Sequence, residues 1–124
     1  MCIRDRIGDR AGLWQVSMGD DQVPNFTAET LARTMDLPLV DPFVESVAGL
    51  GVEGAPLPPG SRGLMQYESL YPRPPEGNRP APETGSHYVP RHTDEMKTQT
   101  VAFFAAGREG EIIDPCGGPC VVSD

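Results

Sequence analysis

The residues best suited to acid–base chemistry are two neighbouring acids and two histidines much later in the chain. Asp20 and Asp21 lie in the stretch 19–25 (Gly-Asp-Asp-Gln-Val-Pro-Asn), and the histidines are His87 and His92. A carboxylate that holds an imidazole in one tautomer lets that imidazole act as the general base for a hydroxyl nucleophile. The alternative for the acids is a turn in which they accept hydrogen bonds from backbone amides. The alternative for the histidines is an exposed loop position without chemical function.

The acids are expected to follow a strand and to precede a helix. Apolar residues alternate with polar ones over residues 13–18, which predicts a strand. From Thr27 the apolar residues follow a helical spacing, and Thr27 or Asn25 is the expected N-cap. Leu37-Pro38 should end this helix, because the residue before a proline avoids helical geometry.

Both histidines precede the second predicted helix. Residues 62–69 predict another strand, and the six prolines of residues 71–90 predict an extended loop. Residues 93–106 predict a helix, which Thr93 caps and Gly107 closes. Its apolar stripe should consist of Met96, Thr100, Phe103 and Phe104. Residues 111–113 predict a short last strand.

The composition restricts the partners of the chain. The 124 residues are enough for one small domain, and 10 basic against 18 acidic residues give a formal net charge of −8. Nucleic acids and anionic membrane surfaces bind basic faces, so we expect neither as a partner. Gly and Pro number 14 each and hydrophobic residues make up only 38%, which predicts long loops. No apolar run approaches the roughly 18 residues of a membrane span, so no transmembrane segment is expected.

Cys116 and Cys120 flank a Gly-Gly-Pro turn that is tight enough to bring the two thiols together. A disulfide is the favoured interpretation, and it suits an exported protein. Free structural thiols and a metal or redox pair are the alternatives. The spacing is not Cys-x-x-Cys, and two cysteines supply only half the ligands of a structural zinc site. We therefore expect neither a metal nor a cofactor.

The first six residues, Met-Cys-Ile-Arg-Asp-Arg, resemble the translated end of a transposon used in sequencing libraries. Read-through of such an adapter gives a metagenomic gene a false start codon. We therefore expect residues 1–6 to be an artefact and residues 7–124 to be the C-terminal portion of a longer protein. Without Cys2 the cysteine count is even. The alternative is a natural N-terminus.

The acid stretch resembles the acid loop of the α/β-hydrolases. In that family an Asp after a late strand of the parallel sheet orients the catalytic His, which lies on a loop before the final helix. The usual pattern there is an Asp, two further residues and then Val-Pro, which selects Asp20 rather than Asp21. The glycine that often stands three residues before this Asp is Ser17 here.

The order of several short motifs resembles a group of secreted bacterial hydrolase-like proteins. These show a Gly-Asp-x-x-Val-Pro-Asn turn, a Leu-Ala-Arg-Thr helix, an Asn/Pro-rich loop, a His-x-x-x-Arg step and a closing Cys-x-Gly-Pro-Cys. The corresponding segments here are 19–25, 31–34, 72–90, 87–91 and 116–120. The resemblance implies that Asp20 is the catalytic acid and His87 the base, with His92 as the second choice because Arg91 matches the step from His87. It also implies an α/β fold: the C-terminal part of an α/β-hydrolase sheet with two helices and long Pro/Gly-rich loops, incomplete as a domain.

The serine nucleophile of such an enzyme is missing from the chain. No Gly-x-Ser-x-Gly occurs, and Ser61, with glycines at −1 and +2, follows the acid instead of preceding it. We therefore expect the intact protein to be an extracytoplasmic or secreted serine hydrolase, esterase- or lipase-like, that acts on a small-molecule ester or a lipid. This chain alone should be inactive. The alternative is a non-catalytic exported interaction module with one small disulfide, in which the Pro-rich segment 71–90 is a ligand or a linker.

Overall fold

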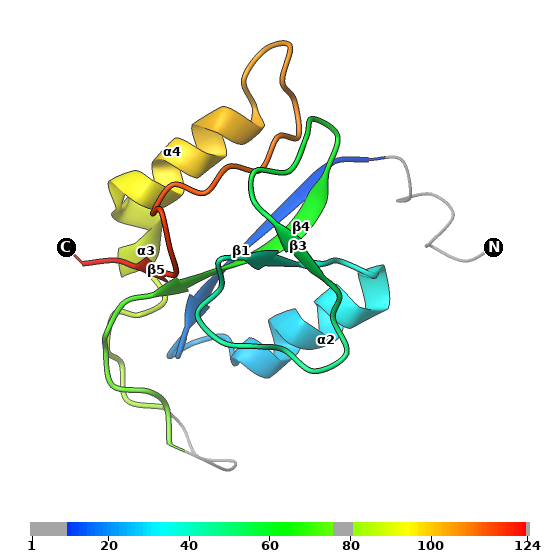
Figure 1. The fold of residues 1–124 in the computed structure, drawn as a ribbon. Coiled ribbons are helices and arrows are strands. Elements are labelled where there is room, and N and C mark those ends of the chain that lie inside the picture. Colours follow the sequence, from blue (N-terminus) through cyan, green and yellow to red (C-terminus); the bar gives the residue numbers. More distant parts are fainter. Residues whose placement is uncertain (1–9, 76–80, 124) are drawn as a thin grey trace.

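The computed structural model describes residues 10–75 and 81–123, which form a mixed α/β fold with a parallel five-stranded sheet and three helices (Figure 1). Residues 1–6, predicted to be an artefact, and Cys2 among them lie outside these ranges. The elements in chain order are β1 (Gly12–Met18), α2 (Asn25–Met35), β2 (Leu39–Asp41), β3 (Val52–Gly54), β4 (Arg62–Glu68), α3 (Val89–His92), α4 (Asp94–Phe103) and β5 (Cys120–Val121).

The sheet has the order β1-β4-β2-β3, and β5 pairs with the last two residues of β4. All strand pairs are parallel, and β1 and β4 run in register from Gly12↔Arg62 to Met18↔Glu68. The segments that follow β1 and β4 therefore start side by side, at the carboxyl ends of the strands. Among the described strands only β4 pairs with β1, so the other edge of β1 is open.

The two long strands were predicted, whereas the short ones were not. β1 and β4 confirm the strands expected over residues 13–18 and 62–69 to within one residue at each end. β2, β3 and β5 have only two or three residues each, which is too short for an apolar period to be detectable. The strand predicted at residues 111–113 is wrong. Ile112 forms only an isolated antiparallel bridge with Leu57, and the last strand is β5.

The helices differ from the prediction in number and in their caps. The predicted N-caps of α2 are wrong, because Pro24 is the N-cap residue and no side chain caps the helix. The helix stops before Leu37-Pro38, as expected, with Asp36 in the left-handed region at φ 55°. Segment 71–90 was predicted to be loop throughout, but it contains the start of α3. Pro90 fits there because a proline near a helix start loses no intrahelical hydrogen bond.

Helix α4 confirms the predicted second helix but is shorter at its C-terminal end. Thr93 occupies the N-cap position, yet its hydroxyl donates to the carbonyl of Pro90 instead of capping α4. Met96 and Phe103 are buried, whereas Phe104 is 73% exposed and does not belong to the apolar stripe. Phe104 is already the C-cap residue, so the change in backbone direction turns its ring away from the core.

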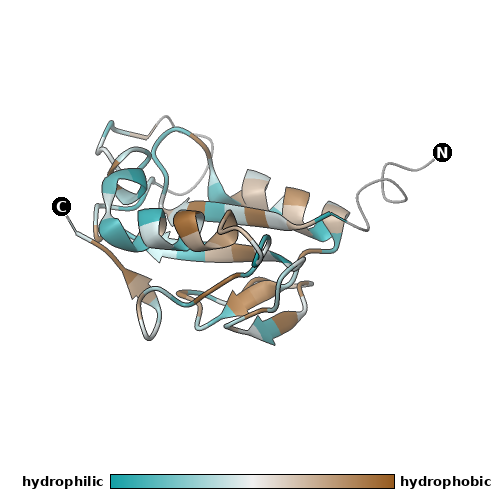
Figure 2. Cartoon of the chain, turned by 90° about the horizontal axis from the view of Figure 1, so that it is seen from above, coloured by the Kyte–Doolittle hydropathy of each residue, from teal (hydrophilic) through white to brown (hydrophobic). Residues whose placement is uncertain are grey.

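Helices α2 and α4 cover opposite faces of the sheet (Figure 1). Side chains of β4 alternate between the two faces: Leu64 belongs to the apolar cluster under α2, and Met65 and Tyr67 belong to the cluster under α4. Polar loops gather at the end of the sheet nearest the C-terminus, where many of the residues are coloured as hydrophilic in Figure 2. No helix in the described part of the chain has the length and apolar character needed to cross a bilayer.

Candidate functional site

Asp20 and His87 form a close side-chain pair at the carboxyl ends of β1 and β4. Nδ1 of His87 lies 2.8 Å from Oδ2 and 3.0 Å from Oδ1 of Asp20. On the opposite side of the ring, a guanidinium nitrogen of Arg91 lies 2.5 Å from Nε2. A carboxylate only accepts hydrogen bonds and a guanidinium only donates them. These two partners fit a ring that carries a proton on Nδ1 and a lone pair on Nε2.

The Asp20 carboxylate is held by its own turn as well as by the histidine. Its Oδ1 accepts hydrogen bonds from the backbone N–H groups of Gln22 and Val23, both at 2.8 Å. The turn expected as the alternative to a histidine partner is thus present together with that partner. Only 11% of the Asp20 side chain and 15% of the His87 side chain are exposed. The two backbone N–H groups hold the Asp20 carboxylate in place independently of His87, as is required of an acid that orients a histidine.

Asp21 binds the backbone of the histidine loop instead of a ring. Its Oδ2 accepts from the N–H groups of Thr84 at 2.5 Å and Gly85 at 3.0 Å, and its Oδ1 accepts from the N–H of His87 at 3.2 Å. The bond from Thr84 contributes most to a lowering of the Asp21 pKa to about 2, against an opposing effect of desolvation. The alternative expected for the acids was that they accept from backbone amides, and Asp21 does so, but from the histidine loop instead of its own turn.

Asn25 closes the acid loop and Ser86 joins that loop to the histidine loop, and the sequence did not predict either role. The Asn25 side chain accepts from the N–H of Gly19 at 2.7 Å and donates to the carbonyl of Ser17 at 2.6 Å. Ser86 is fully buried, and its hydroxyl donates to the carbonyl of Gly19 and accepts from the N–H of Asp21. These bonds fix the hydroxyl of Ser86 between the loops, so it is not placed to attack a substrate.

A cavity of about 350 Å³ lies beside the acid–histidine pair. Asp20, His87 and Arg91 line it together with apolar side chains that include Val16 and Met96. His92, the second choice for a base, is exposed at the end of α3, and its ring makes no hydrogen bond to any residue of the described ranges. The structure thus brings Asp20, His87 and Arg91 together and leaves His92 outside the cavity.

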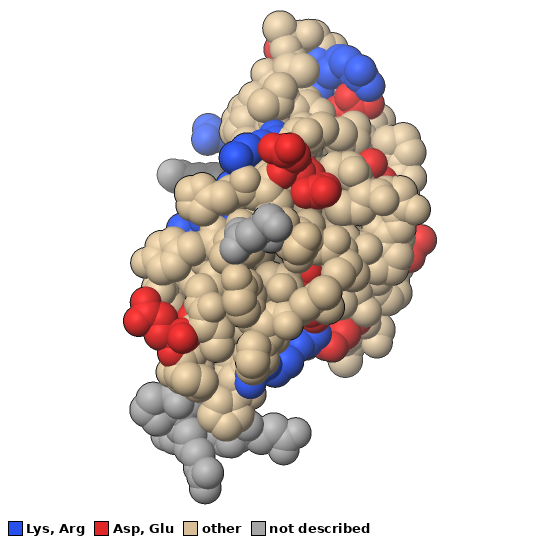
Figure 3. Space-filling view, turned by 90° about the vertical axis from the view of Figure 1, so that its left-hand side faces the viewer, with Lys and Arg blue, Asp and Glu red and all other residues tan. Residues whose placement is uncertain are grey.

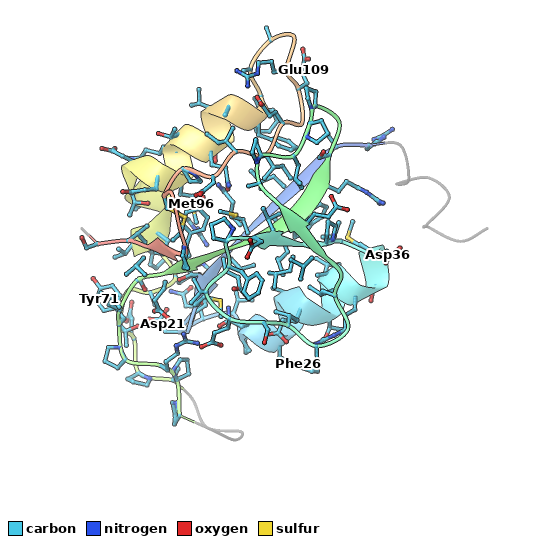
Figure 4. All side chains as sticks on the ribbon, viewed as in Figure 1. Asp21, Phe26, Asp36, Tyr71, Met96 and Glu109 are labelled. Atoms are coloured by element: carbon cyan, nitrogen blue, oxygen red, sulfur yellow. A yellow bond between two sulfur atoms is a disulfide. The ribbon has the colours of Figure 1, made fainter. Side chains whose placement is uncertain are left out.

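Arg73 attaches the start of the Pro-rich segment to the same end of the sheet. Its guanidinium pairs with Glu45 at 2.9 Å and with Glu68, the last residue of β4, at 2.5 Å. Tyr71 and Asp21 are both labelled on this side of the molecule in Figure 4. The segment after β4 therefore begins beside the acid loop and returns to it at Thr84.

Cys116 and Cys120 form a disulfide with a Cα–Cα distance of 5.3 Å, as predicted. Asp114 lies next to the two sulfur atoms, but its Oδ1 accepts from the N–H groups of Cys116 and Gly117. Metals bind thiolates, which the oxidised pair does not offer. The alternatives of free thiols and of a metal site therefore do not apply to this form of the chain.

Fold and site together define a parallel α/β protein with a carboxylate–imidazole pair at the carboxyl ends of two adjacent strands. Ligand sites of open α/β sheets usually lie at this end of the strands. Comparisons with protein-family models, with curated proteins and with solved structures found no match for the chain.

Proposed function

We propose that the chain is the C-terminal part of a secreted serine hydrolase of the α/β-hydrolase type, in which Asp20 is the acid and His87 the base of a catalytic triad. The observation that carries this proposal is the 2.8 Å contact between Asp20 and Nδ1 of His87, which leaves a lone pair on Nε2 beside a cavity. The position of Asp20 just after β1 adds support, because such sites need rigid mounts.

In the proposed reaction, Nε2 of His87 accepts the proton of a serine hydroxyl as its oxygen attacks the carbonyl carbon of an ester. Asp20 stabilises the imidazolium, which then gives its proton to the leaving alcohol. Water enters, loses a proton to Nε2 and releases the acid, and the serine recovers its proton. The serine would lie before residue 7 in the longer protein. The open edge of β1 supports this arrangement, because a larger sheet would continue there.

The proposed location and substrate have separate support. A disulfide persists in oxidising compartments, which agrees with an extracytoplasmic protein. The cavity volume lies in the range of sites for small organic ligands, and its apolar side chains suit the hydrocarbon part of an ester or a lipid. Figure 3 shows small separate groups of acidic and basic side chains on a largely uncharged face of the molecule.

The pair is testable in this chain by the ring nitrogen signals of His87. At alkaline pH, where an imidazole is neutral, long-range proton–nitrogen spectra should show the proton of His87 on Nδ1. Asp20→Asn should abolish this preference, because an amide side chain can donate to the ring as well as accept from it. Asp41→Asn, which removes an exposed acid of β2, is the matched control and should leave the signals unchanged. Unchanged signals in Asp20→Asn would contradict the pairing.

The activity is testable in the longer protein. Long reads from a library prepared without transposons should extend the frame upstream of Ile7 into a Gly-x-Ser-x-Gly motif. In that protein, Asp20→Asn and His87→Gln should each lower kcat for a p-nitrophenyl ester by about 10³- to 10⁴-fold. His92→Gln is the control and should retain activity. A genuine start at Met1, without any upstream serine motif, would instead favour the interaction module.

A further inference from the structure

Arg91 lines the same cavity as His87 and differs from three other arginines of the chain in its partner. Arg33, Arg73 and Arg108 each pair with a glutamate. Within residues 10–75 and 81–123, Arg91 has no carboxylate within ion-pair distance. The only hydrogen bond of its guanidinium there is to Nε2 of His87, and its guanidinium carbon lies 5.7 Å from the ring centroid of Tyr88.

The bond from Arg91 to His87 is weak for an arginine and obstructs the base. A neutral imidazole nitrogen offers one lone pair and no charge, whereas a carboxylate or a phosphate offers two oxygens that match the guanidinium fork. Such an anion would therefore take Arg91 away from the ring. Once Arg91 has moved, the lone pair of Nε2 is available to a nucleophile.

The surroundings of Arg91 leave room for an anion. Arg91 is exposed, so it can change its position without disturbing the core. The carboxylate of Asp20 contacts the His87 ring, but it lies on the Nδ1 side and already accepts hydrogen bonds from two backbone N–H groups. The cavity is lined further by apolar Val16, Ala28 and Met96, which suit the uncharged part of a ligand.

We propose that the site takes esters that carry a second, anionic group, a carboxylate or a phosphate monoester, and that Arg91 binds this group while releasing Nε2. This inference rests on the proposed hydrolase function for its substrate class. Anion binding itself needs only the cavity, His87 and Arg91, so it is measurable in this chain without catalysis.

The test is a titration of the full chain with benzoate, phenyl phosphate and neutral benzyl alcohol, followed by the Nε2 signal of His87. Benzoate or phenyl phosphate should shift this signal in a saturable way, and benzyl alcohol should not. Saturation with benzoate alone identifies a carboxylate, and saturation with phenyl phosphate alone identifies a phosphate. Arg91→Gln should weaken the binding at least tenfold. Arg108→Gln, which removes an exposed arginine paired with Glu111, is the control and should bind as the unaltered chain does.

Two results would overturn the inference: no saturable shift with either anion, or equal binding by Arg91→Gln. Neither result bears on the acid–base pair, because the position of the ring proton is measured before any anion is added. Loss of the Nδ1 proton preference in the unliganded chain would instead contradict the proposed function. In the longer protein, Arg91→Gln should raise KM for an ester with a carboxylate at least tenfold relative to KM for a neutral ester.

Discussion

The backbone N–H of His87 donates to Asp21 at 3.2 Å, while the ring of the same histidine bonds to the neighbouring Asp20. Two consecutive acids thus hold one histidine at its backbone and at its side chain. Because both acids directly follow β1, the position of the ring is set relative to the end of a strand rather than by the long loop before it. The tether to the backbone limits movement of the loop, and the tether to the ring selects the tautomer.

Asp21→Asn should destabilise the fold at neutral pH, and the effect should shrink in acid. Three backbone N–H groups donate to the carboxylate, and they bind a charged acceptor more strongly than the amide oxygen of Asn. The pKa of Asp21 falls from 3.8 to about 2 on folding. Its contribution to stability is therefore complete above about pH 4 and is lost as the pH falls through 2.

Urea unfolding at pH 6 and pH 2.5, followed by the fluorescence of Trp14, the single tryptophan, would measure this difference. Glu109, whose pKa is also lowered by backbone N–H groups, titrates in both proteins and cancels in the comparison. An equal loss of stability in Asp21→Asn at both pH values would show that the charge of Asp21 does not hold the loop.

Gln99→Leu should destabilise the fold more than Tyr67→Phe, although it replaces a buried polar side chain with an apolar one. The Gln99 carbonyl accepts from the Tyr67 hydroxyl at 2.8 Å and from Gln15 at 3.0 Å, and its amide donates to the carbonyl of Ile113. Leucine removes the partner of the Tyr67 hydroxyl and of the Ile113 carbonyl, for an expected loss of about 2–4 kcal/mol, whereas phenylalanine leaves Gln99 paired with Gln15 and costs about 1 kcal/mol. Burial raises the Tyr67 pKa, so its hydroxyl remains a donor in alkaline solution.

Free energies of unfolding of the two variants at pH 7 test this order. The reverse order would mean that packing of the buried tyrosine ring, rather than the polar network around Gln99, dominates this part of the core.

Removal of the disulfide should lower stability by a modest amount. Cys116 and Cys120 are four positions apart, and closing so short a loop restricts the unfolded chain by about 2 kcal/mol. The variant with both Cys116→Ala and Cys120→Ala should show this loss in urea unfolding. The unaltered chain should approach it in the presence of a reductant, while the double variant should not respond to the reductant. No response of the unaltered chain would contradict a stabilising disulfide.

The sequence determined the elements whose patterns are long enough to be unambiguous. β1 follows from the alternation over residues 13–18, α2 and α4 follow from helical spacing, and β4 was expected over residues 62–69. The acids after β1 and the histidines before α4 were also visible, because residue types in a turn do not depend on distant contacts. The cysteine spacing likewise indicated the disulfide.

The motif pattern selected Asp20 as the partner of the histidine ring, but only the tertiary structure decided that Asp21 binds the backbone of the histidine loop. Asp20 and Asp21 are equivalent in charge and adjacent in the chain, and the fold places one at the ring and the other at the backbone. The short strands β2, β3 and β5 form because distant segments of the chain supply their hydrogen bonds. A local sequence pattern does not predict such pairing. The contact between Arg91 and Nε2 likewise depends on the orientation of α3 against the acid loop, since the spacing of the two residues does not specify where their side chains point.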